Sequence, residues 1–288
     1  MKYRTFAFSV QGESHIRLGK CCQDYSYSYS DEKYSVISVC DGHGGRDYVR
    51  SEIGSEIACK TAAENIKAFI ENADIQKLKT NPDEMLTKLE ASIINDWNEK
   101  VNEHYRNNPF TENELFLVSE DARTDYENEI EIESAYGTTL LAAAVTKDYW
   151  FAIQIGDGSC TLLEEDGKFI SPVPDDENCY MNITTSMCDS DALSCFRHYF
   201  SETQPLAVFL CTDGVDNSFD EKENENAFFQ VIVNSYAGMS EKAAEKELSD
   251  FLPKLSAKGS CDDISIAAFI DKYKTKAMAM SETGSSDQ

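Results

Sequence analysis

Residues 34–45 read YSVISVCDGHGG, a mainly apolar run that ends abruptly at Asp41 and Gly42. The β-branched residues of Tyr34–Cys40 favour a strand, and its shortness and apolar character favour burial on both faces. Four further runs have the same character: Thr138–Val145, Tyr149–Ile155, Leu206–Cys211 and Ile264–Ile270. We therefore predict a core built from buried strands.

Segments with helical periodicity lie between these runs. Apolar residues recur at helical steps from Val49 to Ile70, and at every fourth position from Met85 to Tyr105 after the start signal Asn81-Pro82. Two more helices are predicted at Glu221–Tyr236 and Ser240–Leu255, the second bent or ended by Pro253. Strand groups that alternate with helix pairs predict an α+β sandwich, in which helices cover sheets in layers.

Charge and composition exclude several classes of function. In 288 residues, Asp and Glu number 52 against 26 Lys and Arg, which gives a formal net charge of −26. Such a chain repels phosphate backbones and anionic lipid, so we expect no nucleic-acid partner and no membrane partner. The chain has no signal-peptide pattern and no apolar run near the roughly 18 residues of a membrane span, so we expect a cytoplasmic protein.

Acidic residues stand at the ends of the strand-like stretches. Asp41, Asp157 and Asp213 each follow an apolar run and precede a glycine, whereas Asp24 and Asp262 each stand just before such a stretch. The ends of antiparallel neighbours meet at one edge of a sheet, so we expect these carboxylates to crowd one rim. Close carboxylates repel one another unless a cation compensates, and oxygen ligands select Mg²⁺ or Mn²⁺ over zinc. The sequence therefore predicts a metal site.

Six motifs, in this order, resemble those of the metal-dependent protein Ser/Thr phosphatases of type 2C. They are CQD at 22–24, VCDGHGG at 39–45, YGTTLLAA at 136–143, IGDGS at 155–159, CTDGVDNS at 211–218 and GSCDDISIAAF at 259–269. The resemblance covers about residues 1–271 and suggests a bacterial member of the family. It implies a four-layer αββα sandwich of two antiparallel sheets, with two Mg²⁺ or Mn²⁺ ions at its edge. It also implies hydrolysis of phosphoserine and phosphothreonine in proteins by direct attack of a metal-bridged water.

The resemblance further implies roles for individual residues. Asp41 would bridge both ions, Asp24 would hold metal-bound water, and Asp157 would join Asp213 in a third, weaker site. His43 occupies the place of the family's proposed general acid, and we expect the surrounding carboxylates to raise its pKa. The complete set of implied metal-site residues is Asp24, Asp41, Gly42, Asp157, Asp213 and Asp262.

Two positions depart from the family's pattern. Gly19 stands where the family usually has a phosphate-binding arginine, so Arg17, Lys20 or His15 would supply the cation from a shifted loop. We choose Arg17, because a guanidinium holds phosphate bidentately. Asp263 stands where many relatives have asparagine, and there it would tune metal affinity or cap a turn.

Two segments look like insertions into the phosphatase domain. Residues 107–134 are acidic and rich in turn formers, and we expect a solvated surface loop there. Residues 171–204 lie where the family carries a variable flap beside the cleft, so we expect them to influence substrate choice. We expect the tail, residues 272–288, to be flexible because it ends in SETGSSDQ.

Three functions are compatible with these motifs. The leading hypothesis is a protein phosphatase that acts on phosphorylated proteins and opposes a Ser/Thr kinase. The second is a hydrolase of a small-molecule phosphoester that uses the same metals, and the third is a catalytically inactive phosphatase fold that binds partners. The intact set of aspartates argues against the third.

Overall fold

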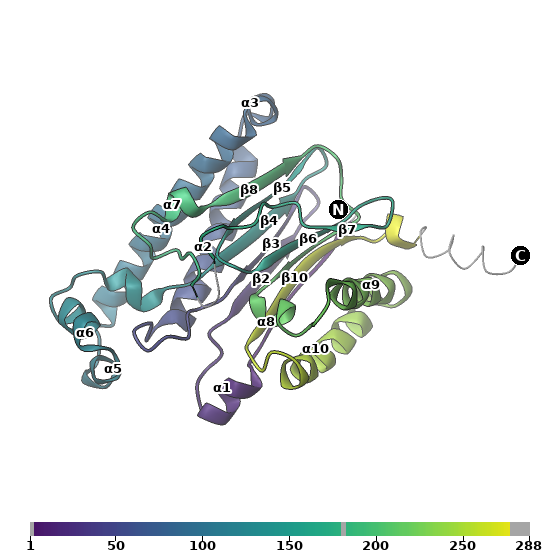
Figure 1. Ribbon diagram of the computed structural model, residues 1–288. Helices are drawn as coiled ribbons and strands as arrows, with labels where there is room; N and C mark the ends of the chain where they lie inside the picture. The colour runs from purple at the N-terminus through teal and green to yellow at the C-terminus, as the bar shows by residue number, and fades with distance from the viewer. Residues whose placement is uncertain (1–2, 180–182, 277–288) are drawn as a thin grey trace, which may run out of the picture.

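The computed structural model describes residues 3–179 and 183–276, which form four layers (Figure 1). One antiparallel sheet has the order β1 (Tyr3–Val10), β10 (Ile264–Asp271), β9 (Ala207–Cys211), β6 (Ser159–Leu163), β7 (Phe169–Ile170). The other has the order β2 (Tyr25–Ser30), β3 (Ser35–Cys40), β4 (Leu140–Val145), β5 (Trp150–Ile155), β8 (Arg197–Ser201). The expected αββα sandwich of two antiparallel sheets is confirmed, and each of the five apolar runs is a strand.

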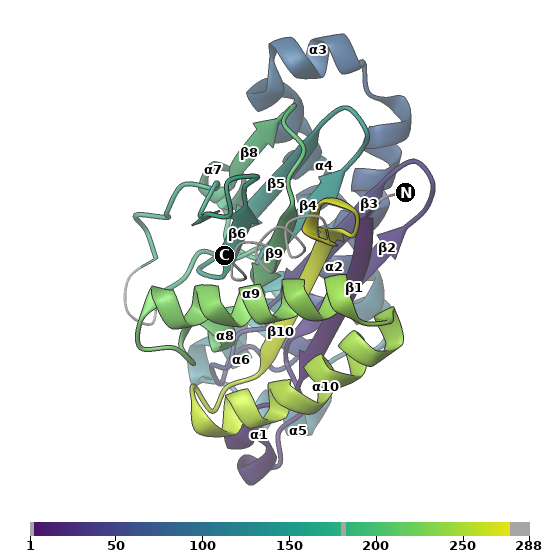
Figure 2. The ribbon, with the colours of Figure 1, turned by 90° about the vertical axis from the view of Figure 1, so that its right-hand side faces the viewer.

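Long helices cover the outer face of each sheet. The second sheet packs against α2 (Ser51–Asn72) and α4 (Pro82–Asn107), and the first against α9 (Lys222–Gly238) and α10 (Glu241–Lys258), which cross in front of its strands in Figure 2. The shorter helices are α1 (Glu13–Leu18), α3 (Ile75–Thr80), α5 (Glu112–Leu117), α6 (Glu120–Glu127), η1 (Ile132–Tyr136), α7 (Ala192–Cys195) and α8 (Asp213–Asp216). All four predicted long helices are present.

The strand β3 shows why the apolar runs decide the fold. Val36 and Cys40 point toward the layer of α2 and α4, whereas Ile37 and Val39 point toward the other sheet. Successive side chains of a strand face opposite ways, so a strand between two apolar layers needs apolar residues at nearly every position. All six residues of β3 are buried.

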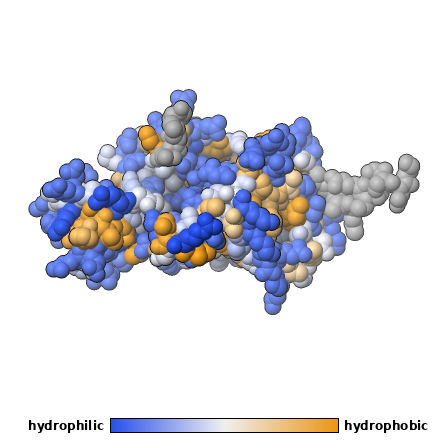
Figure 3. All heavy atoms as spheres, turned by 60° about the horizontal axis from the view of Figure 1, so that its bottom comes forward, coloured by the Kyte–Doolittle hydropathy of each residue, from blue (hydrophilic) through white to orange (hydrophobic). Residues whose placement is uncertain are grey.

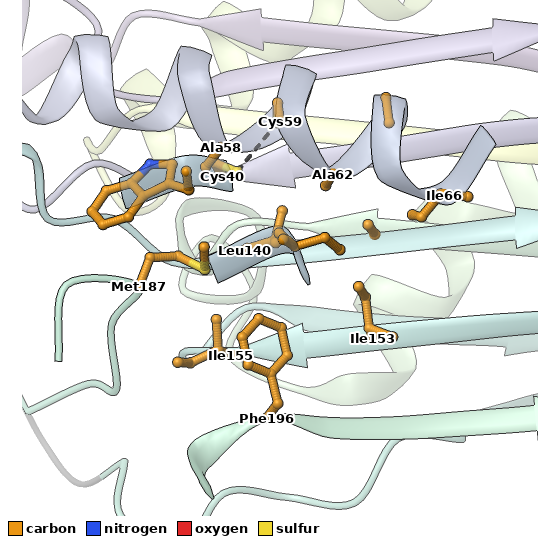
Figure 4. Packing of buried hydrophobic residues seen from close by; sticks show 14 of the residues in the cluster. Cys40, Ala58, Cys59, Ala62, Ile66, Leu140, Ile153, Ile155, Met187 and Phe196 are labelled. Carbon is orange, nitrogen blue, oxygen red and sulfur yellow. Dashed lines mark hydrogen bonds between the residues drawn. The ribbon is translucent and has the colours of Figure 1, made fainter. Parts of the chain in front are cut away.

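The core beneath α2 is packed closely enough to bring two thiols together. In Figure 4, Ala58, Ala62 and Ile66 of α2 face Leu140 of β4, with small side chains where the helix lies nearest the sheet. The Sγ atoms of Cys59 and Cys40 lie 3.2 Å apart, both fully buried. All ten cysteines of the chain are free thiols.

The structure differs from the sequence-based prediction in three segments. Residues 107–134 contain α5, α6 and the start of η1, so the prediction of a loop is wrong, although most of the segment is exposed as expected and only a few residues such as Tyr126 and Ile132 are buried. The end of the predicted flap is β8, the edge strand that pairs with β5. Helix α10 continues past Pro253, which lies on its exposed face, where water can satisfy the carbonyl that loses its helical donor. Residues 277–288 of the predicted tail lie outside the described residues.

A buried arginine attaches the insertion to the rest of the fold. Arg50, only 4% exposed, donates from Nε to Glu114 Oε1 at 2.6 Å and from Nη1 to Asn108 O at 2.6 Å. Its guanidinium also lies 4.4 Å from the centre of the Phe110 ring. Because Arg50 immediately precedes α2, the insertion is fixed to the loop that follows β3.

Candidate metal and phosphate site

The antiparallel registers bring the predicted strand ends to one rim. In the second sheet, Tyr25 at the start of β2 pairs with Cys40 at the end of β3. In the first sheet, Cys211 at the end of β9 pairs with Ile266 near the start of β10. The aspartates just beyond these ends therefore meet where the two sheets adjoin.

The five predicted carboxylates influence one another's pKa. Burial raises the pKa of Asp41 well above its usual value, and the carboxylates of Asp24, Asp213 and Asp262 raise it further. Burial also raises the pKa of Asp213 to about 6, with Asp157 contributing. The pKa of Asp24 is raised chiefly by burial as well. Asp41, Asp157 and Asp262 line one cavity, and Asp24 Oδ2 accepts a hydrogen bond from Thr212, the neighbour of Asp213, so the five residues gather at one rim.

The donor atoms of this cluster are of the kind that a hard divalent cation prefers. In residues 3–179 and 183–276, no group of three or more His, Cys, Asp and Glu side chains is positioned to hold an ion. Burial and mutual repulsion nevertheless disfavour the charged carboxylates, as the raised pKa values of Asp41 and Asp213 show. A divalent cation would reverse that penalty, and carboxylate oxygens suit Mg²⁺ or Mn²⁺.

Backbone hydrogen bonds fix the loop that carries Asp41. Its N–H donates to Thr139 Oγ1 at 3.0 Å, and Thr138 Oγ1 donates to the Asp41 carbonyl at 2.9 Å. Gly42 donates its N–H to the carbonyl of Gln23 at 3.1 Å. A Cβ at Gly42 would lie 2.6 Å from that carbonyl oxygen, so the close approach requires glycine.

Asp263 connects the turn before β10 to the N-terminal segment. Its Oδ1 accepts from Gly12 N at 2.6 Å, and its Oδ2 accepts from Gln23 N at 2.6 Å. The ring Nδ1 of His15 lies 2.9 Å from the same Oδ2. Asp263 is only 3% exposed, so these contacts position the residues that lead into Asp24.

A cavity of about 500 Å³ opens over the carboxylate cluster, lined by Asp41, Asp157 and Asp262 among others. Of the three cations considered from the sequence, Lys20 and His15 line this cavity. Lys20 Nζ lies 3.4 Å from the carbonyl of Gly44. The structure does not bring Arg17 to this cavity. Its side chain is 69% exposed and pairs with Glu13 of its own helix at 3.0 Å. The short helix α1 directs the Arg17 side chain into solvent.

His43 also lines the cavity, but its ionisation differs from our expectation. Its Nε2 lies 2.7 Å from Ser186 Oγ, and its ring meets the Tyr48 ring edge-on at 4.7 Å between centroids. Burial lowers the pKa of His43 to about 4. The expectation of a raised pKa is wrong, because burial of the ring disfavours its charged form.

Several residues of the site do not follow from the strand-end pattern. Thr212 Oγ1 donates to Asp24 Oδ2 at 2.7 Å, and Gln23 Nε2 donates to the His43 carbonyl at 3.0 Å. Both residues stand next to a predicted aspartate in the motifs, which is the signal that identifies them. Ser186 comes from the predicted flap, and only the three-dimensional structure reveals its contact with His43.

Comparison with known proteins supplies the family. Residues 11–253 match the sequence profile of protein phosphatase 2C. The chain belongs to the protein phosphatase 2C family. The resemblance seen in the six motifs is thereby confirmed, and membership of this family supports protein phosphatase activity. None of the curated proteins compared with the chain matches it.

Solved bacterial phosphatases share the fold of this protein phosphatase 2C chain. PppA of Pseudomonas aeruginosa, a key regulatory component of the T6SS, is 16% identical, with a TM-score of 0.56 and coverage of 93% of this chain and 97% of that one. The catalytic domain of the phosphatase PstP, in complex with two manganese ions, is 15% identical, with a TM-score of 0.55 and coverage of 93% and 97%. The S. agalactiae serine/threonine phosphatase is 15% identical, with a TM-score of 0.56 and coverage of 93% and 99%.

The described helices and surface agree with the composition. None of these helices combines the length and apolar character that crossing a membrane requires. Figure 3 shows the underside of the view in Figure 1, where hydrophilic residues predominate and separate the apolar patches.

Proposed function

We propose that this chain hydrolyses phosphoserine and phosphothreonine in proteins and requires Mg²⁺ or Mn²⁺. The observation that carries the proposal is a cluster of five carboxylates from distant parts of a phosphatase-family chain, three of which, Asp41, Asp157 and Asp262, line one cavity. We propose two ions, the number of manganese ions in the complex of PstP. Asp157 and Asp213 are our candidates for a third, weaker site.

Specific residues of the cluster would hold these ions. We propose Asp41, Asp213 and Asp262 as direct ligands, with the Gly42 carbonyl beside them. Asp24 is the most buried of the five clustered carboxylates and accepts a hydrogen bond from Thr212, so we propose that it orients water at the ions. The ions would supply a water nucleophile at neutral pH and would neutralise charge on the phosphoryl oxygens.

The other lining residues would bind phosphate and deliver a proton. We propose Lys20, in place of Arg17, as the cation that attracts the phosphate, because Lys20 lines the cavity. Lys20→Ala should raise KM, whereas Arg17→Ala should leave it unchanged. We propose His43 as the group that hydrogen-bonds the departing oxygen. Its replacement by glutamine should slow phosphopeptide hydrolysis more than hydrolysis of p-nitrophenyl phosphate, whose leaving group needs little protonation.

The decisive test compares variants on p-nitrophenyl phosphate with and without Mn²⁺. Asp41→Asn and Asp213→Asn should each lower Mn²⁺-dependent kcat by at least about 100-fold, because each removes charge that holds the ions. Asp148→Asn is the matched control, since this exposed residue lies in the β4–β5 turn at the opposite end of the strands. Activity that survived both chelation and the two site substitutions would contradict the proposal.

Comparison of substrates tests the remaining alternatives. A protein phosphatase should turn over phosphopeptides better than small phosphorylated metabolites, whereas the reverse order would support a metabolite phosphatase. An inactive binding protein would show no Mn²⁺-dependent turnover of either class. Opposition to a Ser/Thr kinase follows from the proposed substrate class.

A further inference from the structure

A second and larger cleft adjoins the candidate site. It has a volume of about 900 Å³, against about 500 Å³ for the cavity over the carboxylates. The two share Tyr48 and Asp189, which stand at the boundary between them. A chain bound in one would therefore pass directly into the other.

The walls of this second cleft are strongly acidic, so we call it the acidic cleft. Among the described residues that line it, none is lysine or arginine. The acidic residues that line it are Asp47, Asp121, Asp125, Glu131, Glu133 and Asp189. The insertion at 107–134 supplies four of these, because α6 and the segment that follows it form one wall. Arg46, whose Nε lies 3.8 Å from Asp47 Oδ1, is not among the residues that line the cleft. Six acidic residues against no lining cation among the described residues create a negative potential that attracts positive groups.

Three of these carboxylates are not used by the fold. Asp47 accepts from Ser119 N at 2.6 Å and therefore holds the wall in place. The side chains of Asp121, Asp125 and Glu131 make no hydrogen bond or ion pair within residues 3–179 and 183–276. They remain free to pair with groups that enter the cleft.

The acidic cleft also suits the stems of long basic side chains. Ala91 and Ile94 of α4 and Leu193 of α7 line it beside the acids. Lysine and arginine pack their methylene stems on apolar surface while their charged ends reach carboxylates. The anchoring of the insertion by Arg50 keeps this wall in place before a partner arrives, which limits the entropy lost on binding.

We propose that the acidic cleft binds lysine or arginine residues that flank the phosphorylated residue of a protein substrate. The preferred substrate class is then a phosphoserine or phosphothreonine in a basic sequence. This inference rests on the proposed phosphatase function, since the substrate would span the catalytic cavity and the acidic cleft together.

The test measures kcat/KM for two phosphopeptides that carry the same phosphoserine, one flanked by arginines and one by alanines. Wild type should prefer the arginine peptide by about tenfold at low ionic strength, and the preference should shrink as salt is added. Asp121→Lys should reduce the preference to about twofold or less, since it replaces an attraction with a repulsion.

Glu120→Lys is the matched control for this substitution. Glu120 and Asp121 are exposed neighbours in the first turn of α6, so both changes alter net charge and the helix end equally. Only Asp121 lines the acidic cleft. The control should retain the wild-type preference. Equal rates for the two peptides in wild type, or an equal loss of preference in both variants, would overturn the proposal.

A binding measurement separates failure of this inference from failure of the proposed function. If wild type fails to hydrolyse p-nitrophenyl phosphate with Mn²⁺, the phosphatase proposal fails. Fluorescence anisotropy of the unphosphorylated arginine peptide then tests, independently of catalysis, whether the acidic cleft binds basic residues. Binding that Asp121→Lys weakens and Glu120→Lys does not would support the cleft. Binding equal to that of the alanine peptide would overturn it.

Discussion

Replacement of Arg50 by methionine should destabilise the whole protein while leaving the shape of its side-chain stem nearly unchanged. The guanidinium donates from Nη1 to the Tyr136 hydroxyl at 2.7 Å and from Nη2 to the Pro109 carbonyl at 3.1 Å, besides its bonds to Glu114 and Asn108. Methionine removes all these donors and the positive charge. The insertion would then lose its main polar connection to the start of α2.

The loss of unfolding free energy can be estimated from how exposed each partner of Arg50 is. The Tyr136 hydroxyl is fully buried but keeps its 2.8 Å contact with His104. Loss of the hydrogen bond from Arg50 to this hydroxyl therefore costs about 1.5 kcal/mol. The Glu114 side chain is 24% exposed and regains water, so this pair and the two carbonyls cost about 1 kcal/mol together. Loss of the cation–π contact with Phe110 adds about 0.5–1 kcal/mol. The sum is about 3 kcal/mol, or a fall of about 6–12 °C in Tm for a chain of this size.

Thermal and urea unfolding would measure this change, with Arg123→Met as the control. Arg123 forms an exposed pair with Glu127 one turn along α6, and loss of this pair should leave the Tm nearly unchanged. A fall in Tm of less than 2 °C for the Arg50 variant, or equal falls for both variants, would refute the assignment of Arg50 as the anchor.

Three further substitutions test other parts of the structure. Asp263→Asn should cost about 1.5–3 kcal/mol, seen as a lower urea midpoint. The two carboxylate oxygens each accept a backbone N–H, from Gly12 and from Gln23, and in asparagine one of these oxygens becomes an NH₂ group that faces an N–H donor. His198, whose pKa is raised chiefly by its hydrogen bond to buried Glu90, should stabilise the fold fully below its unfolded pKa of about 6.5. Wild type should therefore exceed His198→Gln in unfolding free energy at pH 5.5, with the difference vanishing as pH rises through the raised pKa; a difference that grows with pH would contradict this. Gly54→Ala should cost about 3 kcal/mol or more in a thermal melt, because its Cβ would lie 1.8 Å from a backbone carbonyl oxygen, whereas Gly238→Ala meets nothing within 4 Å and should melt no lower than wild type.

The sequence predicts best those elements whose residues face the same environment on both sides. The strand β3 is apolar throughout because both of its faces are buried, so its composition alone identifies it. By contrast, β2 alternates tyrosine and serine and is only partly buried, and β8 is short and lies at a sheet edge. Neither is an apolar run, because the residues of both strands are only partly buried.

Contacts between distant residues set the limit of prediction at the site. The strand-end aspartates follow from local sequence, since antiparallel pairing brings such ends together. The 248-residue separation of His15 and Asp263 leaves no local trace of their contact, and the same holds for Arg50 and Glu114. A local signal for α5 does exist in the capping box of Thr111 and Glu114, which the acidic, turn-rich composition of the segment obscures.

The clustered carboxylates lie on both sides of the junction between the sheets. Asp24 and Asp41 flank strands of one sheet, whereas Asp213 and Asp262 flank strands of the other. Repulsion between the charged forms of these carboxylates would oppose the apolar packing that holds the two sheets together. A divalent ion bound there would connect the two sheets, so chelation should lower the unfolding free energy of the protein as well as its turnover.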